Sequence, residues 1–203
     1  MPRSEISTQP ANSSNYSKFF GIAIILIIGP IFLFFILGPL LIISYLFLIR
    51  PVQIRGEAMM PRYVQGQYYM SRILSRSGEI KRGDVVVFQS PRNPDLDFFK
   101  RVIALPYEKV MIRNGKVLIN GIELDESQYL SSDITTQAFA AGAIKEGEEF
   151  TIPADYYFVM GDNRAKSDDS RVFGPIPRST IRSKMFFCYY GCNKTTRGGM
   201  MRY

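Results

Sequence analysis

The chain has 203 residues, 46% of them hydrophobic, which suffices for one domain of ordinary size with an anchor and excludes two large domains. Its net charge of +7 comes from scattered basic residues without a run of five or more, so a membrane surface explains the charge better than nucleic acid, which we do not expect as a partner. Histidine is absent, which excludes Ser-His-Asp and Cys-His catalysis and most zinc sites.

The N-terminal part predicts a membrane anchor. Residues 1–18 are polar and are expected to form a disordered tail. Phe19–Ile49 contains no charged residue, and as one helix it would be roughly 46 Å long against a hydrocarbon core of about 30 Å. A cleavable signal peptide has an apolar region of only about 7–15 residues. We therefore expect one permanent transmembrane helix, with Pro30 and Pro39 at kinks or at the ends of its buried part.

The charges that flank this segment do not fix its orientation. Arg3 and Lys18 precede it, whereas Arg50, Arg55 and Arg62 follow it, so that the positive-inside bias does not favour a cytoplasmic N-terminus. The alternative to a span is a core helix of a soluble domain.

Residues 50–192 predict a compact, mainly antiparallel β domain, followed by a C-terminal tail over residues 193–203. Short runs rich in Val, Ile, Tyr and Phe alternate there with Gly, Asn, Asp and Pro. The hairpin signal is Asn114-Gly115, because both residues tolerate the positive φ of a type I′ turn. Residues 131–149 are polar and weakly patterned, which indicates a surface insertion. The predicted strands are Tyr68–Leu74, Asp84–Gln89, Lys100–Leu105, Lys109–Arg113, Lys116–Ile119, Tyr156–Met160 and Met185–Tyr190.

The two cysteines, Cys188 and Cys192, are too few for a disulfide framework or a four-cysteine metal site. They form either two free thiols or one bridge, and the sequence does not decide between these states. Neither a metal-binding cluster nor a phosphate loop is present in the sequence, so we expect no metal and no cofactor.

Four segments carry the chemistry: Arg55–Pro61, Lys81–Phe88, Phe98–Pro106 and Gly161–Gly174. Their order and spacing resemble the conserved boxes of bacterial type I signal peptidases (leader peptidases), and the resemblance covers about residues 52–190. The last segment, which begins Gly-Asp-Asn-Arg and ends Asp-Ser-Arg-Val-Phe-Gly, is the most specific. The resemblance implies an antiparallel β-sheet peptidase domain behind one transmembrane helix, anchored in the bacterial cell membrane and lying outside the cytoplasm.

The resemblance also implies a Ser/Lys mechanism. The nucleophile of the family is the serine before Met-x-Pro, a position that Ala58 occupies here. Its general base is a neutral lysine, here Lys100, which must be desolvated so that its pKa falls from about 10.4 to roughly 7–8. By the same resemblance, Ser167 orients the lysine, and Asp169 pairs with Arg171 to hold the last segment near the site.

The family recognises small residues at the first and third positions before the cut, in an extended peptide that adds to a strand. By position, the side chains of Ile54, Met59 and Phe99 are expected to line these pockets, although ordinary core packing would explain the same three residues. Gly56, next to the oxyanion hole, has no hydroxyl, which leaves backbone amides, chiefly that of residue 58, to stabilise an oxyanion.

Ala58 has no nucleophilic atom, so the mechanism cannot run as written. Three explanations are open: a deliberate Ser→Ala change that prevents self-cleavage or traps substrate, a naturally inactive homologue, or another nucleophile. Arg62-Tyr63 and Tyr107 also depart from the family pattern, which has Thr-Leu and Gly there; they favour natural divergence and would narrow the groove if they faced it.

Two classes of function therefore compete. The first is a membrane-bound endopeptidase that cleaves signal peptides from exported preproteins, and the second is a signal-peptide-binding homologue without activity. A relative of the self-cleaving repressors that share this β fold is disfavoured, because no DNA-binding helix pair precedes the domain. An alternative cation site would use residues of the last segment, namely Asp162, Asn163, Asp168 and Asp169, but their spacing matches no calcium loop. The expected partners are preproteins with small residues before the cut and the lipid bilayer.

Overall fold

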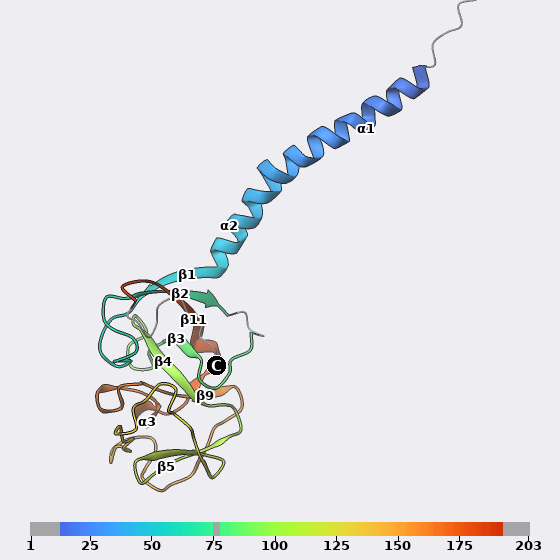
Figure 1. Cartoon of the computed structure of the whole chain (residues 1–203). Coiled ribbons are helices and arrows are strands. Elements are labelled where there is room, and N and C mark those ends of the chain that lie inside the picture. Colours follow the sequence, from blue (N-terminus) through green and yellow to red (C-terminus); the bar gives the residue numbers. More distant parts are fainter. Residues whose placement is uncertain (1–12, 75–77, 193–203) are drawn as a thin grey trace, which may run out of the picture. The chain divides into compact units, whose positions relative to one another are not determined.

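The computed structural model describes residues 13–74 and 78–192, and it divides the chain into two units, residues 1–47 and 48–203. Residues 1–12 of the predicted N-terminal tail and the whole predicted C-terminal tail, 193–203, lie outside the described residues. Both units can be followed in Figure 1.

The first unit is helical. It contains α1 (Ser13–Phe32), a π-helical turn η1 (Leu33–Leu37) and α2 (Gly38–Leu48), whose last residue falls in the second unit. The helix begins six residues before the predicted start at Phe19, since helical hydrogen bonding need not stop where apolar side chains stop. The π-turn precedes Pro39, and the Gly38 N–H bonds the Leu33 carbonyl, five residues back, which is how a helix accommodates a local irregularity without ending.

The helical unit is apolar enough to cross a membrane. Ile24–Ile43 has a mean hydropathy of 2.8, and none of it is buried against the rest of the protein. It is the single candidate span in the part of the chain that the structure describes. Its 20 residues correspond to about 30 Å of helix, the thickness of a bilayer's hydrocarbon core.

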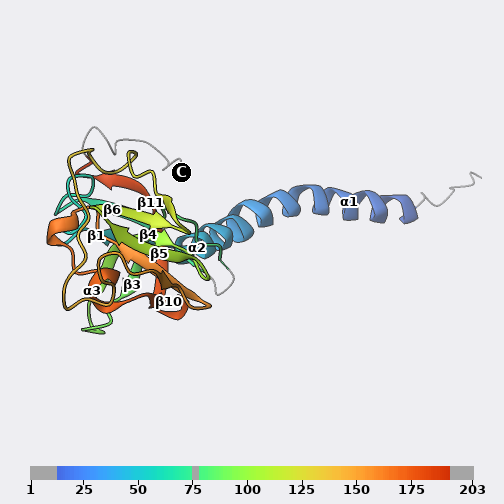
Figure 2. The same ribbon diagram turned by 90° about the horizontal axis from the view of Figure 1, so that it is seen from below.

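The second unit contains two antiparallel sheets, which Figures 1 and 2 show from two directions. The larger is seven-stranded, in the order β1 (Ile49–Gln53), β2 (Tyr68–Ile73), β11 (Ile181–Tyr190), β3 (Val85–Gln89), β4 (Asp97–Ala104), β9 (Tyr156–Met160) and β10 (Ile176–Pro177). The smaller is four-stranded, in the order β7 (Ile122–Glu123), β6 (Lys116–Ile119), β5 (Lys109–Arg113) and β8 (Phe150–Thr151). The short helices η2 (Arg164–Lys166), α3 (Ser170–Phe173) and η3 (Arg178–Thr180) lie between β9 and β11 in the chain. The predicted mainly antiparallel β class is confirmed.

The predicted hairpin is present. Arg113 pairs with Lys116 across the turn, and Asn114 and Gly115 have φ values of 52° and 76°. Both values lie in the left-handed region that a type I′ turn requires.

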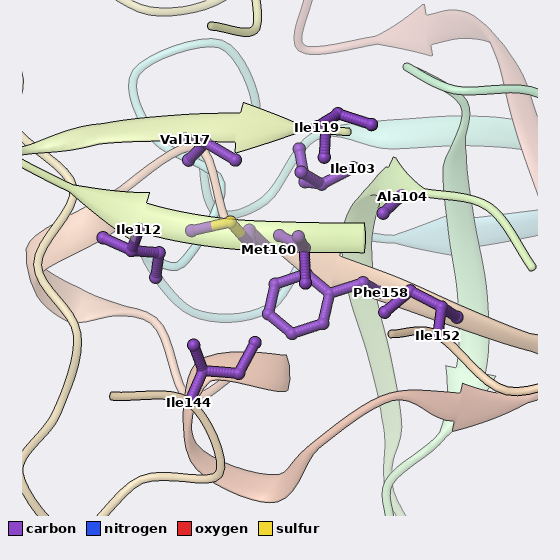
Figure 3. Packing of buried hydrophobic residues seen from close by; sticks show 10 residues of the cluster. Ile103, Ala104, Ile112, Val117, Ile119, Ile144, Ile152, Phe158 and Met160 are labelled. Atoms are coloured by element: carbon purple, nitrogen blue, oxygen red, sulfur yellow. The ribbon is translucent and has the colours of Figure 1, made fainter. Parts of the chain in front are cut away.

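A core lies between the sheets. Figure 3 shows Ile112, Val117 and Ile119 of the smaller sheet gathered around Phe158 and Met160 of β9, and all five side chains are buried. Each such apolar side chain contributes about 1.5–3 kcal/mol relative to exposure.

The polarity of segment 131–149 predicts a surface insertion, but part of the segment is buried. Ile144 joins the core between the sheets, and Thr136 is buried as well. A few well-spaced side chains anchor the segment, so that its mean composition is a poor guide to its position.

Two further clusters flank β3 and β4. One collects buried residues of the β1–β2 connection, among them Ile54, Met59 and Tyr63, against Val85 and Val87 of β3. The other surrounds Val86, Phe88 and Val102. At the end of β11, Cys188 and Cys192 form a disulfide, which settles the alternative that the sequence leaves open.

Candidate active site

A cleft of about 240 Å³ opens where the β1–β2 connection meets β4. Three of the four predicted segments contribute to it: the first, the third and the last. Its lining residues are Ile54, Arg55, Gly56, Glu57, Ala58, Met59, Asp97, Phe98, Phe99, Lys100, Lys166 and Asp168.

Lys100 lies in β4, which is an interior strand hydrogen-bonded to β3 on one side and to β9 on the other. Its side chain is 4% exposed, and its Nζ lies 5.0 Å from the centroid of the Phe98 ring. Burial lowers the pKa of Lys100 from 10.5 to about 8, against the opposing effect of the Asp169 and Asp168 carboxylates. A lysine with this pKa is neutral in a useful fraction of molecules near neutral pH and can act as a base.

The loop that carries Ala58 is held in a defined conformation. Gly56 has a φ of +87°, a value that favours glycine. The Met60 N–H donates to the Glu57 carbonyl at 3.1 Å, and the Tyr63 N–H donates to the Met59 carbonyl at 3.0 Å. Buried Met59 anchors this turn in the core, so that Ala58 faces the cleft from a fixed backbone.

Asp169 and Arg171 form the bidentate pair that the resemblance implies. The two N–O distances, Nε to Oδ1 and Nη2 to Oδ2, are both 2.9 Å, and both side chains are buried. Asp169 also accepts from the Gly161 N–H at 3.1 Å and caps α3, while Arg171 donates to the Arg164 carbonyl at 2.7 Å. The pair therefore ties both ends of the last segment together.

Ser167 does not make the hydrogen bond to Lys100 that the resemblance implies. The residue is 5% exposed, and its Oγ has no partner among the described residues. The hydroxyl instead occupies the space over Gly161, where an added Cβ would lie 2.2 Å from the Ser167 Oγ and 2.4 Å from the Ala58 carbonyl oxygen. Only glycine at position 161 allows the last segment to approach the Ala58 loop so closely.

The predicted pocket residues Ile54, Gly56, Met59 and Phe99 all line the cleft together with Ala58 and Lys100. Ile54 and Met59 are 2% and 3% exposed. Core packing and pocket lining are therefore not alternatives for these side chains, because one face of the cluster is the wall of the cleft.

The divergent residues Arg62, Tyr63 and Tyr107 do not face this cleft, so the condition under which they would narrow it is not met. Tyr63 is fully buried in the core, and Tyr107 is 75% exposed. Arg62 donates to the Gln128 carbonyl, and none of the three is among the residues that line the cleft. Met60 lines a second cleft of about 420 Å³ beside Ile134.

Arg101 and Asp162 form a buried ion pair that sequence reasoning missed. Arg101 Nε and Nη2 donate to the two oxygens of Asp162 at 2.8 and 2.7 Å, and Nη1 donates to the Gly83 carbonyl at 2.7 Å. These contacts join the second, third and last segments. The signal for them was an arginine directly after the candidate base, in a strand too apolar to leave a guanidinium unpaired.

The ion pairs Arg101–Asp162 and Arg171–Asp169 account for two of the acidic residues in the alternative cation site. The carboxylates of Asp162 and Asp169 are occupied by guanidinium groups. Within residues 13–74 and 78–192, no group of three or more His, Cys, Asp or Glu residues could hold a metal ion.

Asn163 and Lys166 make further contacts from the last segment to the Ala58 loop. The backbone N–H of Asn163 donates to the Ala58 carbonyl at 3.0 Å, and its Nδ2 donates to the Glu57 carbonyl at 3.1 Å. Lys166 Nζ lies 2.9 Å from the Glu57 carboxylate in an exposed ion pair. The sequence points to Asn163 only as a member of the alternative cation site, so these loop contacts are visible only in the structure.

Comparison with known proteins gives consistent matches. The family described as "Signal peptidase, peptidase S26" matches residues 23–190. Signal peptidase IB of Staphylococcus aureus is 33% identical over 153 residues, covering 71% of this chain and 79% of that protein. Signal peptidase I of Aquifex aeolicus (strain VF5) is 30% identical over 192 residues, covering 68% of this chain and 74% of that protein. The crystal structure of a signal peptidase I from Enterococcus faecalis V583 is 31% identical, with a TM-score of 0.41, and covers 52% of this chain and 96% of that chain.

Proposed function

Because the chain belongs to the signal peptidase I family of serine endopeptidases, which cleave signal peptides, we propose that its cleft is the site that holds a signal peptide at the cut. Residue 58 is the nucleophile position, and Lys100 is the general base. The observation that carries this assignment is a buried lysine, with its pKa lowered to about 8, in the same cleft as Ala58.

The proposed chemistry requires a serine at position 58. Neutral Lys100 takes the hydroxyl proton while the oxygen attacks the scissile carbonyl, and the resulting ammonium returns the proton to the leaving amine. Ala58 has no oxygen with which to form the acyl intermediate. With Ala58, therefore, the site binds the extended peptide and does not transfer its acyl group.

The walls of the cleft suit the small residues that precede a signal-peptide cut. Ile54, Met59 and Phe99 supply apolar surface, and their packing in the core limits the size of side chain that fits beside them. The substrate class is exported preproteins, which reach the site as extended peptides. The apolar helix anchors the domain to the bacterial cell membrane, with residues 52–203 outside the cytoplasm.

The Ala58→Ser variant tests this function. With the full chain in detergent, we expect it to cleave a preprotein ending in Ala-x-Ala at the cut at least about 100-fold faster than the Ala58 chain, with activity rising as the pH passes about 8. A shortened product on a gel, with its new N-terminus sequenced, is the measurement.

The matched control is the Ala58→Ser, Lys100→Ala double variant, which keeps the hydroxyl and removes the base. Cleavage by the single variant alone supports the Ser/Lys pair. If neither variant cleaves the preprotein although both are folded, only the peptide-binding function remains. Robust cleavage by the Ala58 chain would show that the nucleophile lies elsewhere.

A further inference from the structure

The peptide unit between Glu57 and Ala58 is held on one side only. Its carbonyl oxygen accepts from Asn163 Nδ2 at 3.1 Å and from the Met60 N–H at 3.1 Å. The next carbonyl, that of Ala58, accepts from the backbone N–H of Asn163 at 3.0 Å. One residue of the last segment thus binds two consecutive carbonyl groups of the loop.

These contacts set the direction of the Ala58 N–H. In a trans peptide the carbonyl and the N–H of one unit point in opposite directions. The Glu57–Ala58 peptide is trans, since the one cis bond among the described residues joins Met60 and Pro61. With the Glu57 carbonyl fixed toward Asn163, the Ala58 N–H must point away from Asn163.

The Ala58 N–H is also free to bind a ligand. Within the part of the chain that the structure describes, it donates to no backbone or side-chain acceptor. Ala58 lines the cleft that contains Lys100, whereas Asn163 does not; Asn163 lines the second cleft, beside Met60. Asn163 therefore holds the carbonyls of the loop, and the Ala58 N–H is left as an unused donor on the side away from Asn163.

We infer that Asn163 is a positioning residue, which aims the Ala58 N–H into the cleft as a donor to an oxyanion. The inference rests on the proposed function, because the oxyanion is that of the scissile carbonyl. A donor fixed before the reaction stabilises developing charge without reorganisation, and it acts in the transition state more than in the bound ground state. Since Gly56 offers no hydroxyl, the direction of this N–H matters all the more.

The kinetic test uses the Ala58→Ser chain with Asn163→Leu, which has a similar volume and no donor, and with Asn163→Gln, which keeps an amide. We expect Asn163→Leu to lower kcat about tenfold while KM stays within twofold, because the lost contribution belongs to the transition state. This loss of kcat is smaller than the loss expected on removal of an oxyanion-hole donor, since the Met60 N–H still holds the Glu57 carbonyl. Asn163→Gln should restore most of kcat.

A binding test on the unaltered Ala58 chain needs no catalysis. Two peptides ending in Ala-x-Ala are compared, one with a free C-terminal carboxylate, which places an oxyanion at the site, and one with a C-terminal carboxamide. Asn163→Leu should weaken binding of the carboxylate about tenfold and of the carboxamide less than twofold.

The outcomes distinguish failure of the positioning role of Asn163 from failure of the proposed function. An unchanged kcat in Asn163→Leu, or an equal loss of affinity for both peptides, would overturn the positioning role while leaving the cleft as the substrate site. If the Ala58→Ser chain with native Asn163 is silent and neither peptide binds, the proposed function fails, and this inference fails with it.

Discussion

Lys100 is an ammonium-bearing side chain inside an interior strand, and its burial works against folding at neutral pH. At pH 7 most molecules carry the proton in both states, but only the folded chain withholds the ammonium from water. The fall in its pKa from 10.5 to about 8 corresponds to about 3 kcal/mol of lost stability below pH 8. Between pH 8 and 10.5 the folded chain has already released the proton and the unfolded chain has not, so stability rises with pH and the cost disappears above 10.5.

The Lys100→Met variant should therefore be more stable than the unaltered chain at pH 7, by up to about 3 kcal/mol in the free energy of unfolding, with a gain that shrinks toward pH 10. Denaturation of the detergent-solubilised protein at both pH values measures this. Lys109→Met is the matched control, because Lys109 is exposed in an ion pair with Glu149, and it should change stability by no more than about 0.5 kcal/mol. The same gain from Lys100→Met at both pH values would contradict the burial explanation.

At the scale of elements, β4 places two cations on successive positions, and successive strand side chains point to opposite faces. Lys100 lines the cleft, and Arg101 binds Asp162 and lies 4.2 Å over the ring of Tyr129. The strand thus connects the candidate site with the ionic contacts of the last segment. Removing one partner of a buried pair leaves the other charge uncompensated.

We expect Asp162→Ala to lower the free energy of unfolding by about 3–5 kcal/mol, and the Arg101→Met, Asp162→Ala double variant to lose clearly less than the sum of its two single changes. A double-mutant cycle by chemical denaturation measures the coupling. Glu123→Ala, which removes the exposed pair with Lys116, is the comparison and should cost no more than about 0.5 kcal/mol. Additive losses in the cycle would show that Asp162 does not act through Arg101.

The elements that the sequence predicts correctly are those whose residues carry a local signal. Lys109–Arg113, Lys116–Ile119 and Tyr156–Met160 begin and end where predicted, because alternation or apolar runs and the Asn114-Gly115 turn define them. The strands β7, β8 and β10 have two residues each, which is too short for a period to appear. β1 follows the apolar helix directly, so its first residue belongs to the same uncharged run.

The candidate site was predictable as a set of residues and not as a set of contacts. The resemblance of the four segments points to Lys100, Asp169 and the pocket residues, and the structure places them in one cleft or in contact with the segments that line it. The pairing of Arg101 with Asp162 spans 61 positions and leaves no local pattern. The orientation of the Ser167 hydroxyl depends on the close approach at Gly161, which only three-dimensional packing decides.

At the scale of the whole molecule, the disulfide bears on the side of the membrane where the domain resides. Disulfides form and persist in oxidising compartments and are rare in the cytosol. Cys188 and Cys192 lie at the end of β11, within the β domain, and they are bonded to each other. The flanking charges give no preference, so this bond is an independent reason for the proposal that residues 52–203 lie outside the cytoplasm.

We predict that protease added to sealed cells digests the β domain from outside, while the N-terminal end stays protected by the bilayer. The reasoning joins a 20-residue apolar helix of mean hydropathy 2.8, long enough for one crossing, to a domain with an oxidised cysteine pair. Epitope tags at the two ends, followed on immunoblots before and after membrane permeabilisation, measure the accessibility of each side. A cytoplasmic protein of the same cells must stay intact until permeabilisation, which shows that the cells were sealed. Loss of the C-terminal tag only after permeabilisation would place the β domain in the cytoplasm, away from exported preproteins, and would remove the basis for the proposed substrate.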